Sequence, residues 1–305
     1  MQNKLMPLDR AVSEYIRDGD SVVLGACLES CIPFAVAHEL VRREVRGLNI
    51  IAPISDMCSD LLIGAGCVAE ITGAWVGNVS GGLGHNYRRA VEDQSPNPIR
   101  IHDHSNFSLG MSLFGGAYGM PFVPVRSLLG SDILSSNPQF QLVQNKQETG
   151  PYVRVPPLNP DTAVLAVQRS DKEGNCHYWG NLGVMQEAAL ASEKVILVTE
   201  ELVDSSVIAS DPNRVPFPGF RVDAVCLVPG GVHPSPMTGC LKRDHDFFNE
   251  YHRQSRNQKG FREWVKEWVM EPKDHQAYIR KLGNDLEKLK IRETSPSFPV
   301  NYASQ

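Results

Sequence analysis

The sequence predicts a doubly wound α/β fold, with a mostly parallel sheet and helices on both faces. Short apolar, β-branched runs alternate along the chain with segments of helical periodicity. The run at residues 21–24 leads through small residues into a helix with Phe34, Ala37 and Val41 on one face, and then into a second run at 48–52. This order of strand, helix and strand favours parallel pairing, because a crossover helix joins parallel neighbours.

The same alternation continues to residue 228 and then gives way to charged amphipathic helices at about 244–290. Residues 137–160 show little periodicity and predict a long irregular excursion, either a lid or an interface. Nothing marks a second linker-bounded domain, so residues 1–305 are expected to form one. Further helices are expected at 7–16, 56–63, 85–92, 107–118 and 182–192, and further strands at 68–72, 99–102, 161–167, 194–199 and 222–228.

Composition narrows the functional class. A hydrophobic fraction of 42% supports a packed core, and a net charge of −5 with scattered Lys and Arg argues against nucleic-acid binding. The apolar runs are too short to cross a bilayer, and the first residues lack the apolar stretch of a secretory signal. Seven cysteines without a C-x-x-C pair favour free, mostly buried thiols over zinc or disulfides, and therefore a reducing cytoplasm.

Three small-residue turns are the candidate binding elements. Gly25-Ala26, Ser80-Gly81-Gly82 and Gly130-Ser131 each follow a predicted strand or extended segment. Backbone N–H groups in such turns can approach a carboxylate or a thioester oxygen closely, and the carboxyl ends of parallel strands are where ligands collect. The alternative is that these glycines only turn the chain. The first turn also lacks the glycine spacing of a dinucleotide or P-loop fingerprint.

For several titratable residues the sequence favours a structural role over a catalytic or binding role, or leaves both open. Glu173 lies in an Asp171-x-x-Gly-Asn175 pattern that is typical of a hairpin turn. Glu200 and Glu201 end a strand and have either a structural role or an acid–base role. Arg88 and Arg89 are more typical of a solvated helix face than of a carboxylate clamp, and His102 and His104 lack a third metal ligand, so no metal is predicted.

The chain resembles the family I coenzyme A transferases. Its segment Asp18-Gly19 through Gly25 to Pro33 is similar to the first signature of that family, with departures at Ala26, Cys27 and Cys31. Ordered matches over most of the chain resemble the A (α) subunit of the glutaconate type. They include Pro121-Phe-Val-Pro-Val125, Asp171-Lys-Glu-Gly-Asn175, Val222-Asp-Ala-Val, Pro229-Gly-Gly-Val-His-Pro234 and the tail from Phe261 to Tyr278.

The resemblance implies an enzyme subunit that shapes an acyl pocket and carries no catalytic residue itself. A glutamate of a homologous B (β) subunit would attack the acyl-CoA thioester, in an α2β2 or larger cytoplasmic assembly, and the α chain by itself would be inactive. Coenzyme A thioester is then a substrate, and no permanently bound cofactor is expected. The resemblance places Ser80, Gly81 and Gly82 at a substrate-contacting loop.

We assign Asn106, Gly130 and Ser131 to substrate binding as well, and Gly25 and Ala26 to coenzyme A. Asn106 matches a region where some hydrolase relatives place an active-site acid, and an amide there argues against that chemistry. Two alternatives stay open. One is a subunit of a CoA-thioester hydrolase or ring-opening enzyme on the same fold, and the other is a non-catalytic protein for acyl-CoA sensing or assembly.

Overall fold

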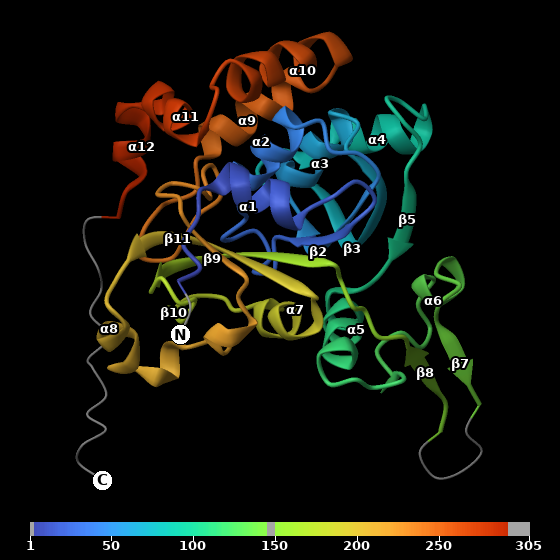
Figure 1. The fold of residues 1–305 in the computed structure, drawn as a ribbon. Helices are drawn as coiled ribbons and strands as arrows, with labels where there is room; N and C mark the ends of the chain where they lie inside the picture. The colour runs from blue at the N-terminus through green and yellow to red at the C-terminus, as the bar shows by residue number, and fades with distance from the viewer. Residues whose placement is uncertain (1–2, 145–149, 292–305) are drawn as a thin grey trace.

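The computed structural model describes residues 3–144 and 150–291 and contains a nine-stranded main sheet (Figure 1). Its strands are β1 (Ser21–Leu24), β2 (Leu48–Ser55), β3 (Val68–Asn78), β4 (Gly82–Leu83), β5 (Arg100–Asp103), β9 (Thr162–Ser170), β10 (Cys176–His177), β11 (Lys194–Leu202) and β12 (Ala224–Leu227). The order is β12-β11-β9-β1-β2-β3-β4, with β10 also paired to β9 and β5 to β3.

The sheet is mostly parallel, as the sequence predicts. Only β4 and β10 pair antiparallel within it. Strand β1 lies at the centre: the chain moves outward through β2 and β3 on one side, and later returns to β9 on the other. Connections that leave β1 and β9 in opposite directions create a switch point at their carboxyl ends, where open α/β sheets bind ligands.

Helices cover both faces of this sheet (Figure 1). Helices α1 (Leu8–Tyr15), α2 (Phe34–Arg42) and α3 (Met57–Gly64) pack on one face, and α4 (His85–Glu92) packs beside α3. Helices α5 (Asn106–Ala117) and α7 (Met185–Ala191) pack together on the other. Three short helices, α8 (Ser205–Ala209), η1 (Pro212–Arg214) and η2 (Gly219–Arg221), lie between β11 and β12.

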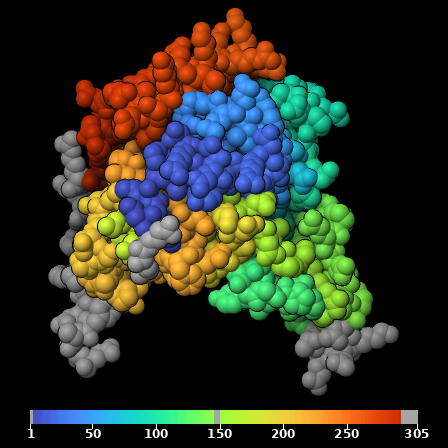
Figure 2. Space-filling view, viewed as in Figure 1, coloured from blue at the N-terminus to red at the C-terminus, as the bar shows by residue number. Residues whose placement is uncertain are grey.

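The C-terminal helices form a further layer over α2 (Figure 2). They are α9 (His245–Gln254), α10 (Gln258–Val265), the π-helical η3 (Lys266–Met270), α11 (His275–Leu282) and α12 (Asn284–Leu289). The apolar face of α10 packs on α9 within this layer. Trp264 is fully buried between the rings of Phe247 and Tyr251, whose centroids lie 5.6 and 4.9 Å from its own.

The described parts of the predicted excursion, residues 137–144 and 150–160, contain two strands, which corrects the prediction of an irregular segment there; residues 145–149 lie outside the described residues. The two strands are β7 (Gln141–Val143) and β8 (Tyr152–Val155), which join β6 (Val123–Val125) in a three-stranded antiparallel sheet ordered β6-β8-β7. Helix α6 (Ile133–Ser136) packs beside it. Phe140, Val153 and Val155 point into a second small core, a pattern that the prolines and glutamines around them mask in the sequence.

Two further expectations concern the membrane and the cysteines. No helix of residues 3–144 and 150–291 is long and apolar enough to span a bilayer. All seven cysteines are free, and all except Cys240 are buried, as predicted. Cys240 is partly exposed.

Candidate functional site

The loop after β3 is held by the side chain of Asn78. Its carboxamide oxygen accepts hydrogen bonds from the backbone N–H groups of Ser80 at 2.9 Å and Gly81 at 3.1 Å. Its nitrogen donates to the carbonyl oxygen of Phe248, on helix α9, at 2.7 Å. Because Asn78 is buried, this one amide fixes the shape of the loop and fastens it to the C-terminal layer.

This arrangement corrects the chemical basis proposed for the Ser80-Gly81-Gly82 loop. The sequence predicts backbone donors that are free to approach a ligand, whereas the N–H groups of Ser80 and Gly81 both donate to Asn78. The loop nevertheless lies at the carboxyl end of β3, with Gly81 and Gly82 exposed. The contact of this loop with substrate stays a prediction.

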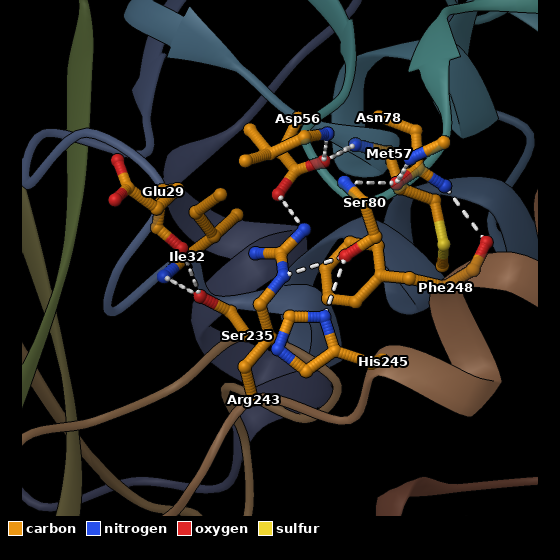
Figure 3. A network of polar contacts seen from close by, with 12 residues as sticks. Glu29, Ile32, Asp56, Met57, Asn78, Ser80, Ser235, Arg243, His245 and Phe248 are labelled. Carbon is orange, nitrogen blue, oxygen red and sulfur yellow. Dashed lines mark hydrogen bonds and ion pairs between the residues drawn. The ribbon is translucent and has the colours of Figure 1, made fainter.

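A chain of polar contacts links the hydroxyl of Ser80 to two other segments (Figure 3). The Nε–H of Arg243 donates to Ser80 Oγ at 3.0 Å, and His245 Nδ1 lies 3.0 Å from the same oxygen. Arg243 Nη2 forms an ion pair with Asp56 Oδ2 at 2.8 Å. The network therefore joins the residues that follow β2 and β3 to the segment that enters α9.

Asp56 is the buried anchor of this network. Its side chain is 0% exposed, and its Oδ1 accepts from the backbone N–H groups of Met57 at 2.8 Å and Val79 at 3.1 Å. It is also the N-cap of α3. Burial raises the pKa of Asp56, and the nearby Arg243 guanidinium opposes that rise. A carboxylate with these three partners is a fixed counter-ion for Arg243.

Arg243 presents the most distinctive chemistry at this edge of the sheet. Its side chain is only 10% exposed, and its guanidinium carbon lies 3.7 Å from the centroid of the Phe248 ring. Its Nη1 is buried and has no hydrogen-bond partner among the described residues. A guanidinium, a hydroxyl and an imidazole grouped in this way can bind a carboxylate or another oxygen anion.

The turn after β1 is packed against the chain itself. Gly25 has a φ of 102°, which favours glycine, and both Gly25 and Ala26 are buried. The carbonyl of Ala26 accepts from Val184 N at 2.9 Å, and a Cβ at Gly183 would lie 2.2 Å from the same oxygen. Residues 182–184 therefore close over this turn. The assignment of Gly25 and Ala26 to coenzyme A stays a prediction.

The remaining predicted binding residues lie outside the Arg243 network. Asn106 is exposed at the first position of α5, which Ser105 caps. Gly130 and Ser131 form the turn before α6, where Ser131 Oγ accepts from Ile133 N at 3.2 Å in the small antiparallel lobe. No hydrogen bond among the described residues links these residues to Ser80. Their proposed contacts with substrate stay predictions.

The candidate carboxylates have structural partners. The Asp171 to Asn175 segment is the hairpin turn between β9 and β10, as predicted, with Asp171 Oδ1 accepting from Glu173 N and Asn175 N at 2.9 Å each. Both carboxylate oxygens of Glu200 accept from Gly230 N, at 3.0 and 2.9 Å. Glu201 is exposed and, as the next residue of β11, points to the other face. The two glutamates therefore do not form an acid–base pair.

The two arginines considered as a carboxylate clamp, Arg88 and Arg89, are held by contacts within the chain. Arg88 is exposed and forms an ion pair with Glu92 at 2.8 Å, which matches the predicted solvated helix face. Arg89 Nη1 donates to the carbonyl of Ser255 at 2.9 Å and ties α4 to the end of α9. Neither holds a position in the Arg243 network.

His102 and His104 have different hydrogen-bond partners. His102 Nε2 hydrogen-bonds Glu70 at 2.7 Å, whereas His104 is buried, with its Nδ1 3.2 Å from Ser108 Oγ. Among the residues that the structure describes, no group of three His, Cys, Asp or Glu side chains is arranged to hold a metal ion. His102 belongs to strand β5, whereas His104 lies between β5 and α5.

Comparison with known proteins gives a consistent result. Residues 5–227 match the family described as Coenzyme A transferase. The A (α) subunit of the 3-oxoadipate CoA-transferase of Pseudomonas knackmussii is 36% identical over 280 residues, which are 92% of this chain and 98% of that one. The corresponding A (α) subunit of the glutaconate CoA-transferase of Acidaminococcus fermentans is 29% identical, with 92% of each chain covered.

Structural comparison agrees with these sequence matches. The crystal structure of the Acidaminococcus fermentans glutaconate coenzyme A-transferase superposes with a TM-score of 0.88 at 28% identity, covering 94% of this chain and 96% of that one. A more distant relative is one subunit of the cholesterol ring-cleaving hydrolase of Rhodococcus jostii, 24% identical over 93% of this chain and 99% of its own. The sequences therefore align over nearly their whole lengths.

Proposed function

Because this chain belongs to the coenzyme A transferase family, we propose that it is the A (α) subunit of a two-subunit enzyme that moves CoA from an acyl-CoA to a carboxylic acid. The observation that carries the proposal is the near-complete alignment with two proteins that are both named as the first of two CoA-transferase subunits. The grouping of Arg243, Ser80 and His245 at the carboxyl edge of the sheet supports a site for carboxylates.

The nucleophilic glutamate is proposed to lie on the B (β) subunit. A carboxylate that attacks a thioester forms an anhydride, which CoA then opens to a glutamyl thioester before CoA passes to the second acid. Two carboxylates at this edge of the present chain already accept hydrogen bonds, since Asp56 is paired with Arg243 and Glu200 binds Gly230 N. Neither is available to attack without breaking these contacts.

Glu29 is the residue of this chain that could serve as the nucleophile instead, so the experiment needs a control for it. It follows β1, is partly exposed, and its side chain has no hydrogen bond or ion pair among the described residues. Its backbone carbonyl accepts from Ser235 Oγ at 2.8 Å, which fixes the loop but not the carboxylate. If this chain carries the nucleophile, Glu29 is the residue to examine.

The test begins with co-expression of this chain and the neighbouring open reading frame, with an affinity tag on this chain only. The purified complex is incubated with acyl-CoA and borohydride, which reduces a glutamyl thioester, and both chains are mapped by mass spectrometry. We expect the reduced glutamate on the partner, and an E29Q variant that keeps both activity and trapping. Reduction of Glu29 itself would show that the nucleophile is on this chain.

The same preparation separates the two alternative functions. A hydrolase consumes the thioester without a carboxylic acid and gives no trapped intermediate, and a non-catalytic protein binds acyl-CoA without turning it over. Both 3-oxoadipate and glutaconate are acids to assay first, because two relatives are named for them. Light scattering on the purified complex tests the proposed α2β2 stoichiometry, and a chain that purifies alone and active contradicts the two-subunit proposal.

A further inference from the structure

The small antiparallel sheet β6-β8-β7 belongs to a separate lobe of the chain. The described residues of this small lobe are 118–144 and 150–157, and Figure 2 shows them, in green, projecting from the body of the molecule. The lobe has its own hydrophobic core, which rests on Met111 and Phe114 of helix α5. Because this core is distinct from that of the main sheet, the lobe offers mainly surface, and the chemistry of that surface indicates its use.

The small lobe is poor in charged residues and rich in the residue types of protein interfaces. Its described residues include only three charged side chains, Arg126, Asp132 and Arg154, whereas charged residues make up 21% of the whole chain. Four of its large apolar side chains are exposed: Tyr118, Met120, Leu129 and Leu142. Aromatic residues, Met and Arg are enriched in protein interfaces, and Lys, Glu and Asp are depleted there. The composition therefore favours a surface that another protein covers.

Strand alternation places aromatic rings and arginines on one face of the small sheet. Four valines of β6 and β8 point into the core of the lobe: Val123, Val125, Val153 and Val155. Pro124 and Arg126, together with Tyr152 and Arg154, lie on the opposite face, because successive side chains of a strand point to opposite sides. Pro124 pairs with Arg154 across the two strands, and the guanidinium carbon of Arg154 lies 4.6 Å from the centroid of the Phe122 ring. We call this side of the sheet the outer face.

A cavity of about 540 Å³ opens on the outer face. Its wall contains no carboxylate and consists of Phe122, Pro124, Val125, Arg126, Gly150 and Tyr152. Arg126 is exposed, and its Nη2 lies 3.8 Å from the position that a Cβ would take at Gly150. Neither Arg126 nor Arg154 forms an ion pair or a side-chain hydrogen bond with any residue that the structure describes. Two uncompensated positive charges beside an apolar cavity favour a partner that is both acidic and apolar.

We propose that the outer face of the small lobe binds the partner B (β) subunit through an acidic segment of that subunit. The proposal rests on the proposed two-subunit function and adds a contact surface to it. Carboxylates of the segment lie against Arg126 and Arg154, and one of its apolar side chains fills the cavity between Phe122 and Tyr152. A pocket flanked by aromatic residues and arginine is the usual environment of an interface hot spot.

The charge of the outer face argues against a second copy of this chain as the occupant. In a two-fold contact the same face meets itself, so the arginines of one copy would approach those of the other. The wall of the cavity has no carboxylate to compensate them, and like charges across an interface are unfavourable. A small anion could fill the cavity, but it would leave the exposed Tyr118 and Leu142 uncovered. A different protein surface with negative charge satisfies both observations.

The first test is photo-crosslinking in the complex of this chain with the product of the neighbouring open reading frame. Tyr152 is replaced by the photoreactive amino acid benzoylphenylalanine, the purified complex is irradiated, and the cross-linked peptides are identified by mass spectrometry. We expect a cross-link to the partner, in a segment that contains Asp or Glu. The matched control is Phe220, an aromatic residue that is 77% exposed in η2, outside the lobe. The same replacement at Phe220 should not yield that peptide.

The second test is charge reversal at Arg126. In R126E we expect the dissociation constant of the complex to rise about 10–100-fold, as measured by analytical ultracentrifugation over a dilution series, and in R126Q the rise should be smaller. R262E is the control, because Arg262 is also exposed and forms no ion pair among the described residues. Its dissociation constant should stay within about twofold of wild type. Reversal of the cross-linked carboxylate of the partner to Lys should restore the affinity of R126E.

The outcomes separate this inference from the proposed function. An intact and active complex that gives no cross-link from position 152, gives one to a second copy of this chain, or keeps its affinity in R126E overturns the inference and leaves the transferase function standing. A cross-link that CoA suppresses while the two chains stay associated assigns the cavity to a ligand and also overturns it. If the complex forms but transfers no CoA, the proposed function fails, and the cross-link and the dissociation constants still decide the inference. If no partner co-purifies, both fail.

Discussion

Asn78 Nδ2 donates to the carbonyl oxygen of Phe248 across 170 positions of sequence, at a distance of 2.7 Å. This bond and the two that Asn78 Oδ1 accepts join the loop after β3 to helix α9. We expect N78A to lower the free energy of unfolding by about 2–3 kcal/mol, because three buried or partly buried backbone groups lose their partner. Urea denaturation measures this, with N78D, which keeps an acceptor oxygen, as a comparison.

In N78D the two N–H groups of Ser80 and Gly81 keep an acceptor, but the carbonyl of Phe248 faces a carboxylate. At pH 7 N78D should therefore also be destabilised, and it should recover toward wild type as the pH falls and the new carboxyl is protonated. Wild-type stability in N78A would mean that the loop is held by other contacts.

Gly81 has no room for a side chain, because His252 lies beside it. A Cβ at Gly81 would lie 2.7 Å from Cγ of His252, whose ring also stacks on His85 with centroids 4.3 Å apart. G81A should lower the free energy of unfolding by about 1–3 kcal/mol through overpacking. In a double-mutant cycle, H252A should relieve most of that cost, whereas additive losses would place the clash elsewhere.

His104 makes stability depend on pH. Burial, followed by the charge of His102, lowers the pKa of His104 from 6.5 to about 4. Between these values the unfolded chain binds more protons than the folded one, so stability is complete above pH 6.5 and falls as the pH drops toward 4. The protonation of His104 is expected to lower the free energy of unfolding by about 3 kcal/mol over this pH range. Unfolding free energies of wild type and H104Q at pH 7 and pH 4 test it, and parallel changes in the two proteins would count against His104.

Cys240 should be the thiol that reacts first in the native protein. It is the partly exposed one of the seven cysteines, and burial, followed by Glu200 and Glu201, raises its pKa to about 11. Because the thiolate is the reactive form, alkylation by iodoacetamide should be slow at pH 8 and rise about tenfold per pH unit up to pH 10. The C240S variant should lose this phase, and its persistence would assign the phase to another cysteine.

Hydrophobic periodicity was sufficient to predict the main sheet, but not the small antiparallel sheet β6-β8-β7. Helix α4 spans the predicted residues, and every strand expected from an apolar run is present in the main sheet. Strand β3 was predicted to end at residue 72 but continues to Asn78. Glycine usually interrupts a strand pattern, yet a Cβ at Gly73 would lie 2.5 Å from the carbonyl oxygen of Ala52, so here it permits close approach of β2.

The candidate site could be predicted only in part. The loop containing Ser80 carries a local glycine signal, whereas Arg243 has none, because its partners lie 163 and 187 positions away in the sequence. A charged residue becomes informative only when its burial is known, and burial depends on the packing of α9 against the loop. Asp56 was the available signal, since a carboxylate directly after a buried strand requires a partner.

The central position of β1 governs the order in which the nascent chain can assemble. Its hydrogen-bonding edges are completed by β2, which follows closely, and by β9, whose register pairs Val22 with Thr162. While the ribosome synthesises the intervening residues, the edge of β1 that will pair with β9 stays open. Long-range pairing of this kind is slow, and an open edge invites aggregation. The first half of the protein should therefore be the part most dependent on chaperones during synthesis.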